Sequence, residues 1–329
     1  MKALVVRKFG EPRDMEVGDL PDPQVEDDSV LIDVRSAAIN YPDLLVIRGR
    51  YQNLPSLPFA PGKDAAGVVL EVGKAVRSVK PGDRAVAHME YGAYATRVAV
   101  PESNCVVLPD SIGFDDAVAI GLPFQTAYFA LCERARFAPG ETVLVTGASG
   151  GVGAAALQLV RALGGTAIAA VNRPEQAEQA MADGASHVVD LSMSDIRESL
   201  RQRVFDATDG RGADIVLDAL GGNVFTAALR ALTWSGRAVV VGFASGEIPQ
   251  IKANYLLVKN IEVSGLQWSD YRDRNPQRVM DVQNELHGLF SAGKITARVA
   301  LKLPFENAAF ALERVDSRGV SGRVVLGFD

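Results

Sequence analysis

The stretch ETVLVTGASGGVGAAALQLVRALGGTAIAAVNR, residues 141–173, decides the fold of this chain. It opens with β-branched and aliphatic residues at 142–146, a pattern typical of a strand buried on both faces. A glycine-rich turn at 147–153 leads into an Ala- and Leu-rich helical pattern. A second apolar run at 166–171 follows a glycine pair. The stretch therefore predicts a strand–helix–strand unit.

The glycines in this turn indicate an anion site. A strand that turns directly into a helix gathers unpaired backbone N–H groups at the positive end of the helix dipole. A pyrophosphate reaches these groups only if no side chain blocks the approach. Because the turn lies between a strand and a helix and a second strand follows, the pattern predicts a dinucleotide site rather than a plain turn.

The end of the second strand bears on which dinucleotide binds. An NAD site usually has Asp or Glu there to accept from the ribose hydroxyls. This chain has Asn172 and Arg173, followed by Pro174 at the first position of the next helix. Arg173 is a poor N-cap residue, but its guanidinium suits the 2′-phosphate of NADP. The alternative is an ordinary solvated arginine, and we favour NADP.

The bulk composition limits the class of protein. The chain has 329 residues, 48% of them hydrophobic and 22% charged, which suits two globular domains. A net charge of −6 gives no support to nucleic-acid binding. No apolar run is long enough for a membrane span, the N-terminus lacks a signal-peptide core, and the two cysteines offer no disulfide framework. We expect a cytoplasmic protein.

The chain divides into three segments by pattern. Residues 1–121 are β-rich and punctuated by Gly and Pro, which predicts a separate barrel-like domain with strands at 3–7, 30–38, 65–72, 84–88 and 94–100. Residues 122–262 alternate strands and helices and predict a doubly wound parallel sheet. The predicted strands are 142–146, 166–171, 187–189, 214–219, 237–242 and 261–265. The predicted helices are 152–163, 174–182, 195–207 and 224–232.

The third segment, residues 263–329, has helical patterns at 276–292 and 305–315 and strand patterns at 297–302 and 323–328. We expect it to return to the first domain, which makes the nucleotide domain an insertion. Ligands of doubly wound sheets bind at the carboxyl ends of the strands. The strand ends at 219–221, 242–245 and 265–268 are therefore expected near the dinucleotide.

The sequence gives no sign of a metal site. Metal ligands cluster at short spacings, whereas His88, His187 and His287 are far apart and have no neighbouring Cys. We predict no zinc.

Seven stretches together resemble the zinc-free quinone oxidoreductases, the zeta-crystallin-like branch of the medium-chain dehydrogenase/reductase superfamily. They are NYPDLLVIRGRY (40–51), PGKDAAGVVLEVG (61–73), VKPGDRA (79–85), LPFQTAYFAL (122–131), VTGASGGVG (145–153), GRGADIVLDALGG (210–222) and LLVKNIEVSGLQW (256–268). The resemblance implies an α/β fold. A GroES-like catalytic domain (1–121 and 263–329) would carry an inserted Rossmann NADP-binding domain (122–262).

The same resemblance allows a comparison with the zinc alcohol dehydrogenases. Asn40 stands where they have the first zinc Cys, Lys63 stands near the zinc His, and Leu122 stands near the second Cys. Without a Lewis acid, an acceptor that is already electrophilic is favoured. The resemblance thus implies hydride transfer from NADPH to a quinone in the interdomain cleft.

Site residues follow from the resemblance. Asn40 and Asp43 are implied at the catalytic centre, with Asn40 hydrogen-bonding the substrate or nicotinamide and Asp43 orienting its neighbours. Tyr41, Tyr51 and Trp268 are implied in the pocket wall, although such aromatics could instead form the core of the domain interface, an alternative that applies above all to Tyr51 and Trp268. Implied cofactor contacts are Thr126, Gly150, Gly151, Val152, Gly153, Asn172, Arg173, Ala219, Leu220, Phe243, Ala244, Ser245 and Arg323. Thr126 could instead cap a helix at 127–133, and Arg323 could be a surface charge.

Two alternatives stay open. One is an enone or enoyl/acryloyl thioester reductase on the same fold, for which Arg48 and Arg50 would have to supply a basic patch. The other is a non-catalytic NADPH-binding protein, because a fold does not fix a function. A homodimer is implied by the resemblance, with residues 248–258 as the expected contact segment.

Overall fold

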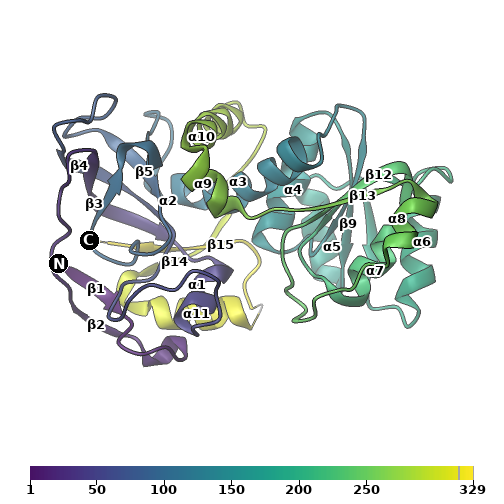
Figure 1. Cartoon of the computed structure of the whole chain (residues 1–329), viewed down its shortest axis with the longest axis horizontal. Coiled ribbons are helices and arrows are strands. Elements are labelled where there is room, and N and C mark those ends of the chain that lie inside the picture. Colours follow the sequence, from purple (N-terminus) through teal and green to yellow (C-terminus); the bar gives the residue numbers. More distant parts are fainter. Residues whose placement is uncertain (318, 329) are drawn as a thin grey trace. The chain divides into compact units, whose positions relative to one another are not determined.

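The computed structural model describes residues 1–317 and 319–328. The chain forms two compact units, each a β-sheet with helices (Figure 1). Unit 1 comprises Met1–Leu122 and Ser269–Asp329, and unit 2 comprises Pro123–Trp268. The fold is therefore of the mixed α/β class, with the second unit inserted in the sequence of the first.

Unit 1 is built on a seven-stranded, mostly antiparallel sheet of the GroES-like type, in the order β14-β15-β3-β4-β5-β7, with β6 paired to β3. Its strands are β3 (Ser29–Ala38), β4 (Asp64–Val72), β5 (Arg84–His88), β6 (Arg97–Pro101), β7 (Cys105–Val107), β14 (Val299–Pro304) and β15 (Arg323–Gly327). A separate antiparallel pair is formed by β1 (Lys2–Val5) and β2 (Glu16–Asp19).

The C-terminal segment completes this sheet. β15 pairs antiparallel with β3, placing Leu326 opposite Ala37, and both residues are fully buried. The helices of unit 1 are α1 (Tyr41–Ile47), α2 (Phe114–Ala119), α9 (Trp268–Arg274), α10 (Pro276–Ser291) and α11 (Ala308–Asp316), with 3₁₀ turns at Pro12–Asp14, Glu102–Asn104 and Phe305–Asn307. α9 begins at the last residue of unit 2.

Unit 2 contains a six-stranded parallel sheet in the order β10-β9-β8-β11-β12-β13. Its strands are β8 (Thr142–Thr146), β9 (Thr166–Val171), β10 (His187–Asp190), β11 (Ala213–Asp218), β12 (Leu232–Val240) and β13 (Glu262–Gly265). Its helices are α3 (Leu122–Tyr128, whose first residue belongs to unit 1), a π-helical segment (Phe129–Arg134), α4 (Gly151–Ala162), α5 (Pro174–Ala182), α6 (Ile196–Asp206), α7 (Gly222–Arg230) and α8 (Ala253–Lys259). This is the Rossmann strand order, in which the direction of winding reverses between β8 and β11.

Several predicted bounds are confirmed, namely those of β5, β8, β9 and α5. The strand predicted at 94–100 is wrong in its first half, since β6 begins at Arg97 and Tyr94 donates its backbone N–H to Pro61 instead. β12 begins at Leu232 rather than residue 237, and it passes Ser235 with a φ of 63°.

Candidate functional site

The glycine-rich turn joins β8 to α4 at the reversal point of the unit 2 sheet. Gly147 has a φ of 63°, which favours glycine. A Cβ on Gly153 would lie 2.3 Å from the Gly147 carbonyl oxygen and 2.6 Å from Ala148 Cα. Glycine at 153 is therefore required for the helix to pack this closely on the turn.

The start of α4 fits an anion. Gly150 is the N-cap residue and has no side chain to accept from the first-turn N–H groups, so Gly151, Val152 and Gly153 present theirs at the positive end of the helix dipole. A Cβ on Gly150 would meet only the Gly147 carbonyl oxygen, at 3.3 Å. Gly150, Gly151 and Gly153 thus leave this backbone open on their own sides, as the predicted phosphate cradle requires, and the cradle itself stays a prediction.

The loops after β11 and β12 lie against each other beside this turn. Ala244 donates its backbone N–H to Ala219 at 3.0 Å, and Ser245 donates to Leu220 at 3.0 Å. The Leu220 side chain lies 3.2 Å from the position of a Cβ on Gly147. Four of the predicted cofactor residues are therefore brought together at the carboxyl ends of the strands.

Asp218, at the end of β11, organises this region and was not predicted from the sequence. Its side chain is fully buried and accepts from the Thr146 hydroxyl and, at 2.8 Å, from the Gly221 N–H. Burial raises the pKa of Asp218. The sequence does contain a signal for this residue, because Asp218 directly follows an aliphatic run in the DIVLDALGG stretch and so stands at the end of a predicted strand.

At the end of β9, Asn172 and Arg173 are both exposed. Arg173 is the N-cap of α5, as predicted, and its side chain makes no capping hydrogen bond. Gln176 accepts from the Asn172 N–H at 3.1 Å through its side-chain oxygen. The guanidinium is thus presented at the strand end where a 2′-phosphate lies in NADP sites.

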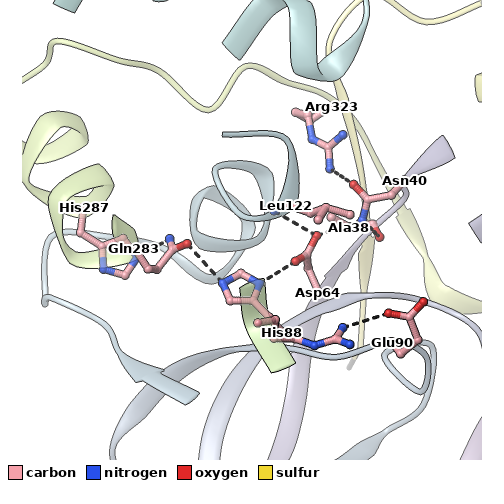
Figure 2. A network of polar contacts seen from close by, with 10 residues as sticks. Ala38, Asn40, Asp64, His88, Glu90, Leu122, Gln283, His287 and Arg323 are labelled. Atoms are coloured by element: carbon pink, nitrogen blue, oxygen red, sulfur yellow. Dashed lines mark hydrogen bonds and ion pairs between the residues drawn. The ribbon is translucent and has the colours of Figure 1, made fainter. Parts of the chain in front are cut away.

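In unit 1 a buried chain of polar side chains surrounds Asp64 (Figure 2). Asn40 Nδ2 donates to Asp64 Oδ2 at 2.9 Å, and the Leu122 N–H faces the same oxygen at 3.4 Å. His88 Nδ1 lies 2.7 Å from Asp64 Oδ1. On the other side, Arg323 Nη2 donates to Asn40 Oδ1 at 2.8 Å. Both polar atoms of the Asn40 side chain therefore have a partner within unit 1.

Asp43 is the third residue of α1, and its side chain accepts hydrogen bonds at the start of the helix. It accepts from the Asn40 N–H at 2.8 Å and from the Tyr94 hydroxyl at 2.6 Å, both through Oδ2. Burial raises the pKa of Asp43 to about 6, opposed by the Tyr94 hydrogen bond and by the Lys63 charge. Its Oδ1 is buried and has no hydrogen-bond partner among the residues that the structure describes. These contacts join Asp43 to the backbone of Asn40 and to Tyr94, and the predicted orienting role of Asp43 stays a prediction.

Lys63 lies in a second ionic cluster next to this chain. Its ammonium is 2.8 Å from Glu90 Oε1 and 4.6 Å from the centre of the Tyr51 ring. Arg272 Nη1 contacts the other Glu90 oxygen at 3.1 Å. The predicted pocket residue Tyr51 is thus held over a buried cation.

The other predicted residues are placed as follows. Tyr41 is 45% exposed at the start of α1, Phe243 is 41% exposed, and Trp268 is buried. Thr126 lies within α3 and is 9% exposed, so it does not begin a helix and the capping alternative is wrong. Arg323 is partly buried and paired with Asn40, so the surface-charge alternative is also wrong.

His88, Tyr94 and Gln283 were missed as site residues by the sequence analysis. Apart from the Gln283–His287 contact, which spans four positions, their partners are 24 to 195 positions away, and no local pattern marks them. Among residues 1–317 and 319–328, no group of three or more His, Cys, Asp or Glu side chains lies as a metal site requires. Within the same residues, no helix is both long and apolar enough to span a bilayer.

Comparisons with known proteins identify the family of this chain. The profile of the alcohol dehydrogenase GroES-like domain matches residues 26–110, and that of the zinc-binding dehydrogenases matches residues 151–284. The quinone oxidoreductase-like protein 2 homolog of Nematostella vectensis is 36% identical over 305 residues, covering 90% of this chain and 81% of the relative. Quinone oxidoreductase of Mus musculus is 30% identical, covering 99% of this chain and 97% of the relative.

Solved structures give the same result. Escherichia coli quinone oxidoreductase complexed with NADPH superposes with a TM-score of 0.91 at 28% identity over the whole of both chains. The two units and the glycine-rich turn define a nucleotide-dependent oxidoreductase of the medium-chain type. Within that class, the chain belongs to the quinone oxidoreductase branch of the medium-chain dehydrogenase/reductase superfamily.

Proposed function

We propose that this protein is an NADPH-dependent quinone reductase that works without zinc. The observation that carries the proposal is the set of groups around Asp64. Asn40 and Leu122, which stand where zinc relatives have cysteines, both direct N–H groups at Asp64, and the Lys63 ammonium stands where they have histidine. An amide, an aliphatic side chain and an ammonium are not zinc ligands.

The chain's own residues fit NADPH. The glycine-rich start of α4 suits the pyrophosphate, and the exposed Arg173 suits the 2′-phosphate. When bound, NADPH supplies the hydride for the reaction. The protein supplies binding and orientation, for which we assign the strand-end residues Ala219, Leu220, Ala244 and Ser245.

The polar residues of unit 1 have a different role in this proposal. A quinone that accepts a hydride gains negative charge on oxygen, and a fixed cation stabilises that charge. Arg323 is held by Asn40, which is held in turn by Asp64. We assign Asn40 and Asp43 to orienting this region. Tyr41, Tyr51 and Trp268 are proposed to line the apolar part of the substrate site.

The thioester alternative finds no support at Arg48. Its guanidinium contacts Glu11 and Asp316, each at 2.6 Å, so its charge is already compensated. A coenzyme A group needs uncompensated cations for its phosphates. A simple enone remains a competing acceptor that kinetics can separate from a quinone.

We also propose a homodimer formed through the 248–258 segment of unit 2. Ile248, Leu257 and Val258 are each more than 70% exposed, with values of 75%, 77% and 73%. β13 is the last strand of the sheet, and its outer edge is unpaired within the described part of the chain. Exposed apolar clusters beside a free strand edge are typical of contacts between subunits.

The test is steady-state oxidation of NADPH and of NADH with 1,4-benzoquinone and with a small enone. We expect the quinone to be the faster acceptor and NADPH the preferred donor. Arg173→Ala should reduce the NADPH preference by about tenfold or more, since it removes a charge-assisted contact. Arg136→Ala is the matched control, because Arg136 is exposed and pairs with Glu262 at the amino end of β13.

Three outcomes would contradict the proposal. Equal use of NADH by the wild-type protein would remove the assigned role of Arg173. A faster enone reaction would change the substrate class. NADPH binding without reduction of either acceptor would favour a non-catalytic role.

A further inference from the structure

The buried network of polar side chains around Asp64 extends further, toward α10. His88 Nε2 lies 3.2 Å from the amide oxygen of Gln283, and the Gln283 amide nitrogen lies 3.0 Å from His287 Nε2. Figure 2 shows the run of side chains from α10 to Arg323. His88, Asp64, Gln283 and His287 are each at most 2% exposed. Burying a polar group lowers the stability of the fold unless the group is paired, so this network of buried polar side chains needs an explanation.

The direction of the hydrogen bonds is fixed at the Arg323 end. A guanidinium can only donate, so Asn40 must present its oxygen to Arg323 and its amide nitrogen to Asp64. Asp64 Oδ2 accepts this bond and faces the Leu122 N–H. Asp64 Oδ1 is left for His88. The orientation of Asn40 therefore depends on the Asp64 carboxyl group, whose other oxygen is in contact with His88.

The backbone packs closely against the Asp64 and His88 side chains. A Cβ on Gly121 would lie 3.0 Å from Asp64 Oδ1 and 3.2 Å from His88 Cε1. The backbone at Gly121 thus closes over the Asp64–His88 pair. If the imidazole were removed, Asp64 Oδ1 would lose its close donor in a dry interior, and the carboxyl group would turn to find another.

We propose that His88 is a positioning residue of this enzyme: through Asp64 it fixes the Asn40 amide, and through Asn40 it fixes Arg323. The inference rests on the proposed function, because Asn40 and Arg323 are assigned there to the reacting region. His88 itself touches no substrate. A histidine that served only to join α10 to the sheet would affect stability and leave Asn40 in place.

Three variants separate these roles. His88→Leu removes the donor to Asp64 and keeps apolar volume. His88→Asn places an amide nitrogen near the position of Nδ1 and so restores that donor, although it cannot reach Gln283. His287→Leu is the matched control, since it removes a buried imidazole of the same chain at the end farthest from Asn40.

The kinetic arm uses single-turnover reduction of 1,4-benzoquinone by NADPH. We expect His88→Leu to slow hydride transfer by about tenfold or more, because small misplacements of a reacting region are costly. NADPH affinity should stay within about twofold, since the pyrophosphate and 2′-phosphate contacts proposed above all lie in unit 2. His88→Asn should recover most of the rate, and His287→Leu should keep the wild-type rate.

The second arm does not depend on turnover. In protein labelled with ¹⁵N-asparagine, the side-chain NH₂ signals of Asn40 are identified by their loss in Asn40→Ala. We expect these signals to shift and to exchange faster with solvent in His88→Leu, and to return in His88→Asn. Unchanged Asn40 signals in His88→Leu would overturn the proposal whatever the kinetics show.

The two arms also separate this proposal from the proposed function. If the wild-type protein reduces no quinone while the Asn40 signals respond as described, the function fails and the positioning role stands. If the His88→Leu rate loss is not recovered by His88→Asn and His287→Leu loses the same amount, His88 is structural and the proposal is wrong.

Discussion

Asn40 shows how one residue can be fixed by its neighbours on both sides. Its amide oxygen accepts from Arg323 and its amide nitrogen donates to Asp64, while its backbone N–H is taken by Asp43. If Asn40 also hydrogen-bonds a substrate or the nicotinamide, as the sequence analysis expects, its amide oxygen or nitrogen must share that bond with Arg323 or Asp64. The role proposed here, in which Asn40 orients Arg323, uses a hydrogen bond that the structure already contains.

Asp43 gives a pH-dependent prediction. Its folded pKa of about 6 lies above the ordinary value of 3.8, so ionisation favours the unfolded chain. The stability linked to the neutral carboxyl group is present below about pH 4 and is lost as the pH rises through about 6. Asp43→Asn keeps an oxygen for Asn40 and Tyr94 but cannot ionise.

The unfolding free energy of Asp43→Asn relative to wild type should therefore rise between pH 4 and 7, by as much as about 3 kcal/mol. Chemical denaturation at several pH values measures this difference. If the unfolding free energies of the two proteins changed in parallel with pH across this range, ionisation of Asp43 would not destabilise the folded protein, and the prediction would be wrong.

The residues that sequence analysis could predict are those with local signals. The glycines at 147–153 and Arg173 before Pro174 are marked by their immediate neighbours. The Asp64 network is not, because Asp64 and His88 are separated by 24 positions and His88 and Gln283 by 195. Only the folded chain brings these side chains together.

At the scale of elements, glycine has two different roles in the β8–α4 turn: Gly153 allows close packing, and Gly150 leaves room for a ligand. Gly153→Ala has no room for its methyl group against Gly147 and Ala148 and should lower stability by about 1–3 kcal/mol or more. Gly150→Ala has an ordinary φ of −79° and one contact at 3.3 Å, so it should fold. Its methyl group should instead obstruct the pyrophosphate.

We expect Gly150→Ala to weaken NADPH binding by about tenfold or more with a nearly unchanged Tm. Thermal unfolding and NADPH fluorescence titration measure the two effects. Normal NADPH affinity in Gly150→Ala would mean that the phosphate does not approach this turn.

Elements differ in how well the sequence predicts them. β8, β9 and α5 are predicted to the residue because aliphatic runs, Gly and Pro mark their ends. The short helices α1, α2 and α8 were missed, since six or seven residues give too little periodicity. Strand β7, with three residues, is held by pairing with β5 rather than by its own pattern.

At the scale of the whole molecule, the proposed dimer gives a prediction of its own. Leu257→Asp should produce a monomer, because it buries a charge in the proposed apolar contact. Phe310→Asp is the control, since Phe310 is 54% exposed on α11 in unit 1. Sedimentation velocity measures both. A Leu257→Asp protein with the wild-type sedimentation coefficient would exclude this segment as the contact.

The most direct test of the central claim is single-turnover mixing of the protein with NADPH and 1,4-benzoquinone under anaerobic conditions, comparing ordinary NADPH with NADPH deuterated at nicotinamide C4. We predict one hydroquinone per NADPH consumed and a slower reaction with the transferable deuterium, because the carbon–hydrogen bond breaks in hydride transfer. Loss of NADPH absorbance without hydroquinone, or no loss at all, would contradict the assignment as a quinone reductase.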